Sequence, residues 1–100
     1  MEKNIKRINK MEEILVKQEK FVKKFGKLLD EYKENFLEFE ELERYYYSDE
    51  YMEDLELDEE GKLEDISRGV LSEDSVYDLI SDYYNIGINM LELGTEILKK

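Results

Sequence analysis

Cysteine, histidine, proline and tryptophan are all missing from this sequence of 100 residues, and only five residues are glycine. Without cysteine the chain can form neither a disulfide nor a thiolate metal site. Without histidine it lacks the commonest general base and the usual ligand of transition metals. The lack of proline and the scarcity of glycine remove the residues that break helices most strongly. The composition therefore favours long, uninterrupted helices and argues against most metal-dependent and nucleophilic enzymes.

Long hydrophobic runs are also missing. No apolar run exceeds three residues, as at 14–16 and 45–47. A membrane-spanning helix needs about 20 apolar residues, and a signal peptide needs a continuous apolar core. We therefore expect a cytoplasmic protein without membrane association. The length allows one domain at most.

What the sequence does contain is an apolar pattern with steps of three and four residues over about 2–47. Nothing in this stretch stops a helix, since Gly26 alone costs about 1 kcal/mol relative to alanine. We call the pattern the apolar seam. Its three rows, with Gln18 and Asn35 as polar gaps, are Ile8, Leu15, Val22, Leu29, Phe36; Met11, Phe25, Tyr32, Phe39, Tyr46; and Ile14, Phe21, Leu28, Leu42. A seam of this width is typical of a helix that packs against more than one neighbour.

The remainder of the chain predicts two further helices. A short acidic helix over about 49–60 is expected to begin at an N-cap, Ser48, and to end at Gly61-Lys62. A connector over 61–71 then leads to a second long helix over about 73–98, with Ser72 as its N-cap. The expected fold is all-α, in which the second long helix of a single domain (1–100) folds back as an antiparallel hairpin or bundle.

Two glycines of the second long helix, Gly87 and Gly94, lie seven residues apart on its apolar face. Glycine inside a helix costs stability, so this pair indicates close approach of another backbone or of a bulky ring. Phe21, Phe25 or Tyr32 of the first helix is expected to fill that space.

The net charge of −12 is unevenly distributed. Residues 1–27 contain nine Lys/Arg and four Asp/Glu, whereas residues 28–67 contain three Lys/Arg and seventeen Asp/Glu. A basic helix end can bind nucleic acid or anionic lipid. Repulsion from the acidic remainder opposes both, so we expect neither direct nucleic-acid binding nor lipid binding.

The acidic residues do not complete a recognisable site. The segment 56–67 resembles an EF-hand calcium loop when Gly61 is aligned to the invariant glycine, but Ser67 stands where the bidentate glutamate is required. Carboxylate pairs such as Glu34/Glu38 lack the Glu-x-x-His partners of a diiron bundle. We therefore predict no enzyme activity, no catalytic residues, no metal and no cofactor.

Tyrosines and carboxylates gather around the turn between the first two helices. Tyr45, Tyr46 and Tyr47 are consecutive and cannot all point inward, so at least one must be exposed and available to a partner. We predict two groups of interaction residues. They are Ile8, Met11 and Leu15 near the start of the first helix, and Tyr45, Tyr47, Tyr51, Asp54 and Asp58 around the turn.

Several segments together resemble a family of small bacterial proteins, the domain of unknown function 4298. They are Tyr45-Tyr46, Gly61-Lys62-Leu63, and the run Arg-Gly-Val-Leu-Ser-Glu-Asp over 68–74 with Tyr77 and Leu79. Tyr51 stands where tryptophan is expected, and Glu64 where proline is common. The resemblance implies an all-helical fold and assigns no activity. In its most distinctive segment, Arg68, Gly69 and Ser72 are expected to be structural, with Arg68 paired to Asp54 or Asp58.

Two functions fit these features. The first is a non-enzymatic intracellular module for protein–protein interaction that self-associates. The alternative is an acidic protein that mimics nucleic acid and inhibits a DNA- or RNA-binding protein, as phage anti-defence proteins do.

Helix lengths favour a homodimer that also binds an unidentified protein. At about 1.5 Å per residue, a returning helix covers the first one only to about Glu19. Ile5, Ile8, Met11, Ile14 and Leu15 then need cover from a second chain, most simply across a two-fold axis with the chains antiparallel.

Overall fold

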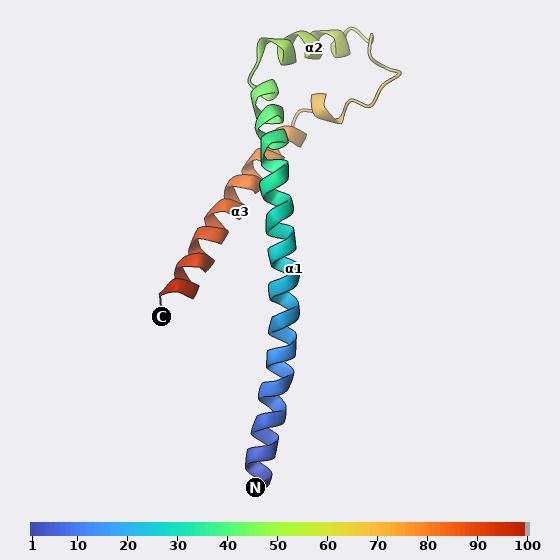
Figure 1. Cartoon of the computed structure of the whole chain (residues 1–100). Helices are drawn as coiled ribbons and strands as arrows, with labels where there is room; N and C mark the ends of the chain where they lie inside the picture. Colours follow the sequence, from blue (N-terminus) through green and yellow to red (C-terminus); the bar gives the residue numbers. More distant parts are fainter. Residues whose placement is uncertain (100) are drawn as a thin grey trace. The chain divides into compact units, whose positions relative to one another are not determined.

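The computed structural model describes residues 1–99 and is helical throughout its regular structure (Figure 1). Helix α1 spans Glu2–Tyr46, α2 spans Asp49–Glu59, a 3-10 turn η1 spans Gly69–Leu71, and α3 spans Ser75–Leu98. No strand occurs in residues 1–99. The predicted all-α fold, with a long, a short and a second long helix in that order, is confirmed. The predicted fold-back of the second long helix stays a prediction.

The chain divides into two compact units, Met1–Glu38 and a second that begins at Phe39. The first unit contains α1 only as far as Glu38, and none of the residues of α1 is buried. Glu2 in the first turn and Arg44 in the last turn suit the positive and negative ends of the helix dipole. The first unit contains no second element, so nothing within it covers the part of the apolar seam up to Glu38.

Helix α2 begins and ends with well-formed caps. The Ser48 hydroxyl accepts a hydrogen bond from the Tyr51 N–H at 3.2 Å, as the sequence predicted for an N-cap. At the other end the Gly61 N–H bonds to the Asp58 carbonyl and the Lys62 N–H to the Leu57 carbonyl, which is the Schellman pattern. Gly61 has a φ of 75°, a left-handed conformation that glycine adopts without strain.

The start of α3 differs from the prediction. Ser72 is not its N-cap, because the helix begins at Ser75 after Asp74, and no side chain caps it. Ser72 ends η1 instead. Its hydroxyl donates to the Gly69 carbonyl at 2.8 Å and also bonds to the Ser75 hydroxyl. The prediction of Ser72 as an N-cap was wrong because serine completes a short turn as readily as it begins a helix.

The core of the second unit is small. Its buried apolar residues come from α2, η1 and α3, and they are Tyr51, Leu71, Val76 and Ile80. Beside them the ring of Phe39 from α1 stacks on Tyr83 from α3, with 3.7 Å between ring centroids and 10° between planes. This stack attaches the first third of α3 to the last turns of α1.

The close neighbour predicted at Gly87 and Gly94 is not found in this unit. A Cβ atom added at either glycine would meet no atom within 4 Å. The glycines therefore leave α3 with a flat, open surface rather than a contact that only glycine permits.

Candidate interaction site

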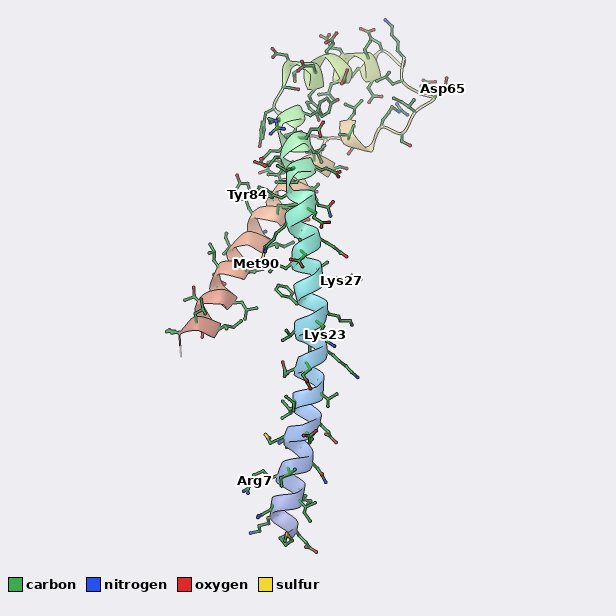
Figure 2. All side chains as sticks on the ribbon, viewed as in Figure 1. Arg7, Lys23, Lys27, Asp65, Tyr84 and Met90 are labelled. Carbon is green, nitrogen blue, oxygen red and sulfur yellow. The ribbon has the colours of Figure 1, made fainter. Side chains whose placement is uncertain are left out.

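The apolar seam of α1 is exposed over residues 8–28. Ile8 is 58% exposed, Leu15 52% and Val22 71%, and the other large seam residues between 8 and 28 are exposed to a similar degree. Figure 2 shows side chains extending from α1 along its length. An apolar stripe along a helix is normally buried against another element. The seam is thus a surface suited to a partner helix.

Charge divides α1 into two halves. Residues 1–27 carry a net charge of +5, and residues 28–46, with two Lys/Arg and seven Asp/Glu, carry −5. Arg7, Lys23 and Lys27 extend outward from the basic half (Figure 2). All charged side chains of 1–38 are exposed, so this division is presented to any helix that binds alongside.

The tyrosine cluster at the end of α1 forms a second, more enclosed feature. The Tyr45 hydroxyl donates a hydrogen bond of 2.6 Å to Asp54 Oδ2 in α2. The rings of Tyr45 and Tyr46 both pack on Tyr51, with centroids 5.5 and 5.1 Å away. These contacts join the last turn of α1 to α2.

Burial, followed by the hydrogen bond to Asp54 and the nearby negative charge, raises the pKa of Tyr45 to about 12. The phenol is therefore neutral at physiological pH and acts as a hydrogen-bond donor. A neutral donor fixed to a carboxylate is a structural link. It does not have the lowered pKa of an activated nucleophile.

Arg68 and Asp58 hold the connector between α2 and α3. Arg68 Nη1 lies 2.7 Å from Asp58 Oδ1. Of the two partners that the sequence offered, Asp58 is the one found. Asp54 instead accepts from Tyr45.

These contacts show which of the predicted site residues are available to a partner and which are engaged within the protein. Ile8, Met11, Leu15 and Tyr47 are exposed and can contact a partner. Tyr51 is only 7% exposed, so its ring is part of the core and does not form a contact surface. Asp54 and Asp58 are half-buried and already hold Tyr45 and Arg68.

Gly69 and Ser72 belong to the 3-10 turn, where the Gly69 carbonyl accepts bonds from the Ser72 N–H and hydroxyl. The stack of Phe39 on Tyr83 was not anticipated. Both residues lie on predicted apolar faces, but a single sequence does not give the register between two helices.

Within residues 1–99, no group of three or more Asp or Glu side chains is arranged to hold a metal ion. In the same range no helix is long and apolar enough to cross a membrane. The candidate site is the exposed seam of α1 with its divided charge.

A family model described as a domain of unknown function, DUF4298, matches residues 8–93. The chain belongs to the DUF4298 family. The span shared with the DUF4298 model begins at the first residue of the seam and includes α2, the connector and most of α3. No curated protein and no solved structure is significantly similar to the chain. Membership of DUF4298 supplies no activity, so function must be argued from the surface itself.

Proposed function

We propose that this DUF4298 protein is a non-enzymatic, cytoplasmic module for protein–protein interaction that self-associates through the apolar seam of α1. The observation that carries the proposal is the exposure of this seam along a helix with no buried residue. Exposed apolar surface of this extent, bordered by charged residues, is typical of a surface that another protein covers.

The size of the hydrophobic effect supports this assignment. Full burial of a large aliphatic side chain is worth about 1.5–3 kcal/mol. Ile5, Ile8, Met11, Ile14 and Leu15 are 41–58% exposed, so each has about half of that value left to gain. Over two copies this amounts to roughly 10 kcal/mol, similar to the estimated 4–15 kcal/mol cost of association. Burial of these five side chains in each copy is therefore only just enough to offset the cost of association. A stable dimer must bury a longer part of the seam.

The alternative, mimicry of nucleic acid, draws support from a different surface. Most carboxylates of α2, including Glu50, Glu53 and Glu56, are exposed. Asp54 and Asp58, however, are engaged inside the protein, which interrupts the row of charges. The seam of α1 has no role in such a mimic. We therefore place the mimic second.

Affinity capture with three baits tests the proposal. The wild-type chain is compared with the variant Met11→Glu/Leu15→Glu and with Asn9→Glu/Val16→Glu. The control makes the same change in charge on exposed residues of the same helix, outside the seam. Mass spectrometry identifies the captured proteins.

We expect the wild-type and control baits to capture a common set of proteins, including untagged copies of this chain, and the seam variant to lose that set. If all three baits captured the same nuclease or polymerase and no copy of the chain, the mimic would replace the module.

A further inference from the structure

Building on the proposed self-association, we infer that the start of the seam, from Ile8 to Val22, is covered by α3 of a second copy. The contact uses a row of α3 that we call its outer face: Tyr84, Ile88, Leu91, Thr95 and Leu98. Each copy carries one seam and one outer face, so the contact forms twice across a two-fold axis. The inference rests on the reach of α3, on the two exposed rows and on charge.

The chain's own α3 is too short to cover the start of the seam. Tyr83 is held on Phe39, and α3 ends at Leu98, about 15 residues or 22 Å further. Along the continuous α1, Val22 is about 17 residues or 25 Å from Phe39, and Ile8 is about 31 residues or 46 Å away. The seam from Ile8 to Val22 lies beyond that reach and must be covered from outside the chain.

Helix α3 carries more apolar surface than its own unit covers. On one face Val76 and Ile80 are buried and Tyr83 stacks on Phe39. The outer face begins one residue after Tyr83, roughly a quarter of a turn around the helix. Its four large apolar side chains are between 52% and 84% exposed. A helix that is apolar on two neighbouring faces normally packs against two partners, and the outer face still lacks one.

The seam and the outer face match in length and spacing. The seam row 8, 11, 15, 18, 22 and the outer row 84, 88, 91, 95, 98 both advance by alternate steps of three and four residues. Each row spans about 21 Å of helix, as packing side by side requires. Thr95 does not interrupt the outer face, because its hydroxyl already donates a hydrogen bond of 2.8 Å to the Leu91 carbonyl.

Charge argues against α1 of a second copy as the occupant. Residues 1–27 carry a net charge of +5, so two such segments would repel each other in either direction. The acidic end of α1 is not free to pair instead, because Tyr32, Phe36 and Phe39 already make contacts within the chain.

Of the two remaining helices, α3 fits the seam better than α2. In α2, which the structure describes in full, Met52 is the one large apolar side chain that is exposed. Helix α3 combines its outer face with a net charge of −4, since residues 75–98 contain four Asp/Glu and no Lys/Arg. All four carboxylates are exposed. Helix α3 therefore complements both the apolar and the basic character of the seam.

Complementation between two variants tests the inference. Met11→Glu/Leu15→Glu places two charges in the seam and keeps the outer face. Ile88→Glu/Leu91→Glu places two charges in the outer face and keeps the seam. Neither variant can form the contact with itself. A mixed dimer, however, contains one intact seam facing one intact outer face.

Sedimentation equilibrium measures the association of each variant and of their equal mixture. We expect the mixture to associate at least about tenfold more tightly than either variant alone, and native mass spectrometry to find one copy of each variant in its dimers. The matched control is Asn85→Glu/Asn89→Glu, which adds the same charge to exposed residues on the polar face of α3 and should dimerise like the wild type.

Circular dichroism first compares the helix content of all variants. Ile88 and Leu91 are exposed, so their substitution should leave the fold intact. If helix content falls in Ile88→Glu/Leu91→Glu, the milder Leu91→Gln takes its place in the same measurements.

A dimer formed by the α3 variant alone would show that the seam pairs with another seam. A mixture that associates no more tightly than its components would exclude the crossed contact. Both results overturn the inference and leave self-association intact. A monomeric wild type would overturn the proposed self-association as well, and would leave the seam to a different protein.

Discussion

Tyr45 links the last turn of α1 to α2 through a single short hydrogen bond. Its hydroxyl is 2.6 Å from Asp54 Oδ2, and its ring packs edge-on against the buried Tyr51. Tyr45→Phe removes the donor and leaves the half-buried carboxylate without this partner, which we expect to lower the free energy of unfolding by roughly 1–2 kcal/mol. Urea denaturation measures the change. Tyr47→Phe is the control, because Tyr47 is 70% exposed and should tolerate the substitution.

The raised pKa of Tyr45, about 12 in the folded state against 10 for the free side chain, adds a pH dependence. The folded state holds this proton more tightly than the unfolded state. Its contribution to stability is therefore complete below pH 10 and is lost as the pH rises through 12. We predict that the free energy of unfolding falls more steeply between pH 10 and 12 in the wild type than in Tyr45→Phe. Parallel curves for the two proteins would contradict the assignment.

Arg68 stabilises the connector through one contact, Nη1 to Asp58 Oδ1. The pair is partly exposed, so Arg68→Ala should cost only about 0.5–1 kcal/mol, measured as a lower melting temperature. Because the contact is a single bond, Arg68→Lys should keep much of it, unlike a two-pronged pair. Lys62→Ala is the matched control, since its pair with Glu60 is more exposed. A melting temperature unchanged by Arg68→Ala would remove Arg68 from the account.

At the scale of the elements, α3 carries Gly87 and Gly94 on its apolar face. Substituting them tests whether glycine is required there. A Cβ at Gly87 or Gly94 would meet no atom within 4 Å in the described chain. Gly87→Ala and Gly94→Ala should therefore each stabilise the protein by up to about 1 kcal/mol, through helix propensity alone. Thermal unfolding of each variant measures this. Destabilisation by either would mean that a neighbouring backbone or ring approaches α3 in solution, as the glycine spacing first indicated.

Local signals in the sequence predicted the elements well. The three-and-four spacing located α1, and the N-cap Ser48 and the terminal glycine Gly61 located α2. The start of α3 was misplaced because Ser72 satisfies a short turn. Of the contacts between elements, only the ion pair of Arg68 was predicted, because the sequence offered few candidate partners for it. The stack of Phe39 on Tyr83 and the bond from Tyr45 to Asp54 depend on three-dimensional packing that periodicity does not encode.

The seam was readable from the sequence, and its residues Ile8, Met11 and Leu15, predicted to contact a partner, are exposed. The predicted residues around the turn are only partly available. Tyr51 shows the difference. It was grouped with interaction residues because it lies among tyrosines and carboxylates, yet its side chain is in the core. Composition indicates which residues are able to bind a partner, whereas burial decides which of them are available.

For the whole molecule, the central claim is that the seam of α1 is covered by self-association, and the hydrophobic effect dominates this contact. Screening by salt weakens charge pairs and leaves apolar burial intact. We therefore predict a dimer that persists in high salt. Met11→Glu with Leu15→Glu should abolish it, because two charges would enter the seam of each copy.

Sedimentation equilibrium at tens of micromolar, in low and in high salt, tests this claim most directly. The account predicts the mass of a dimer for the wild type and for Asn9→Glu/Val16→Glu in both salts, and the mass of a monomer for Met11→Glu/Leu15→Glu. A monomeric wild type, or a dimer unaffected by the two seam substitutions, would contradict it.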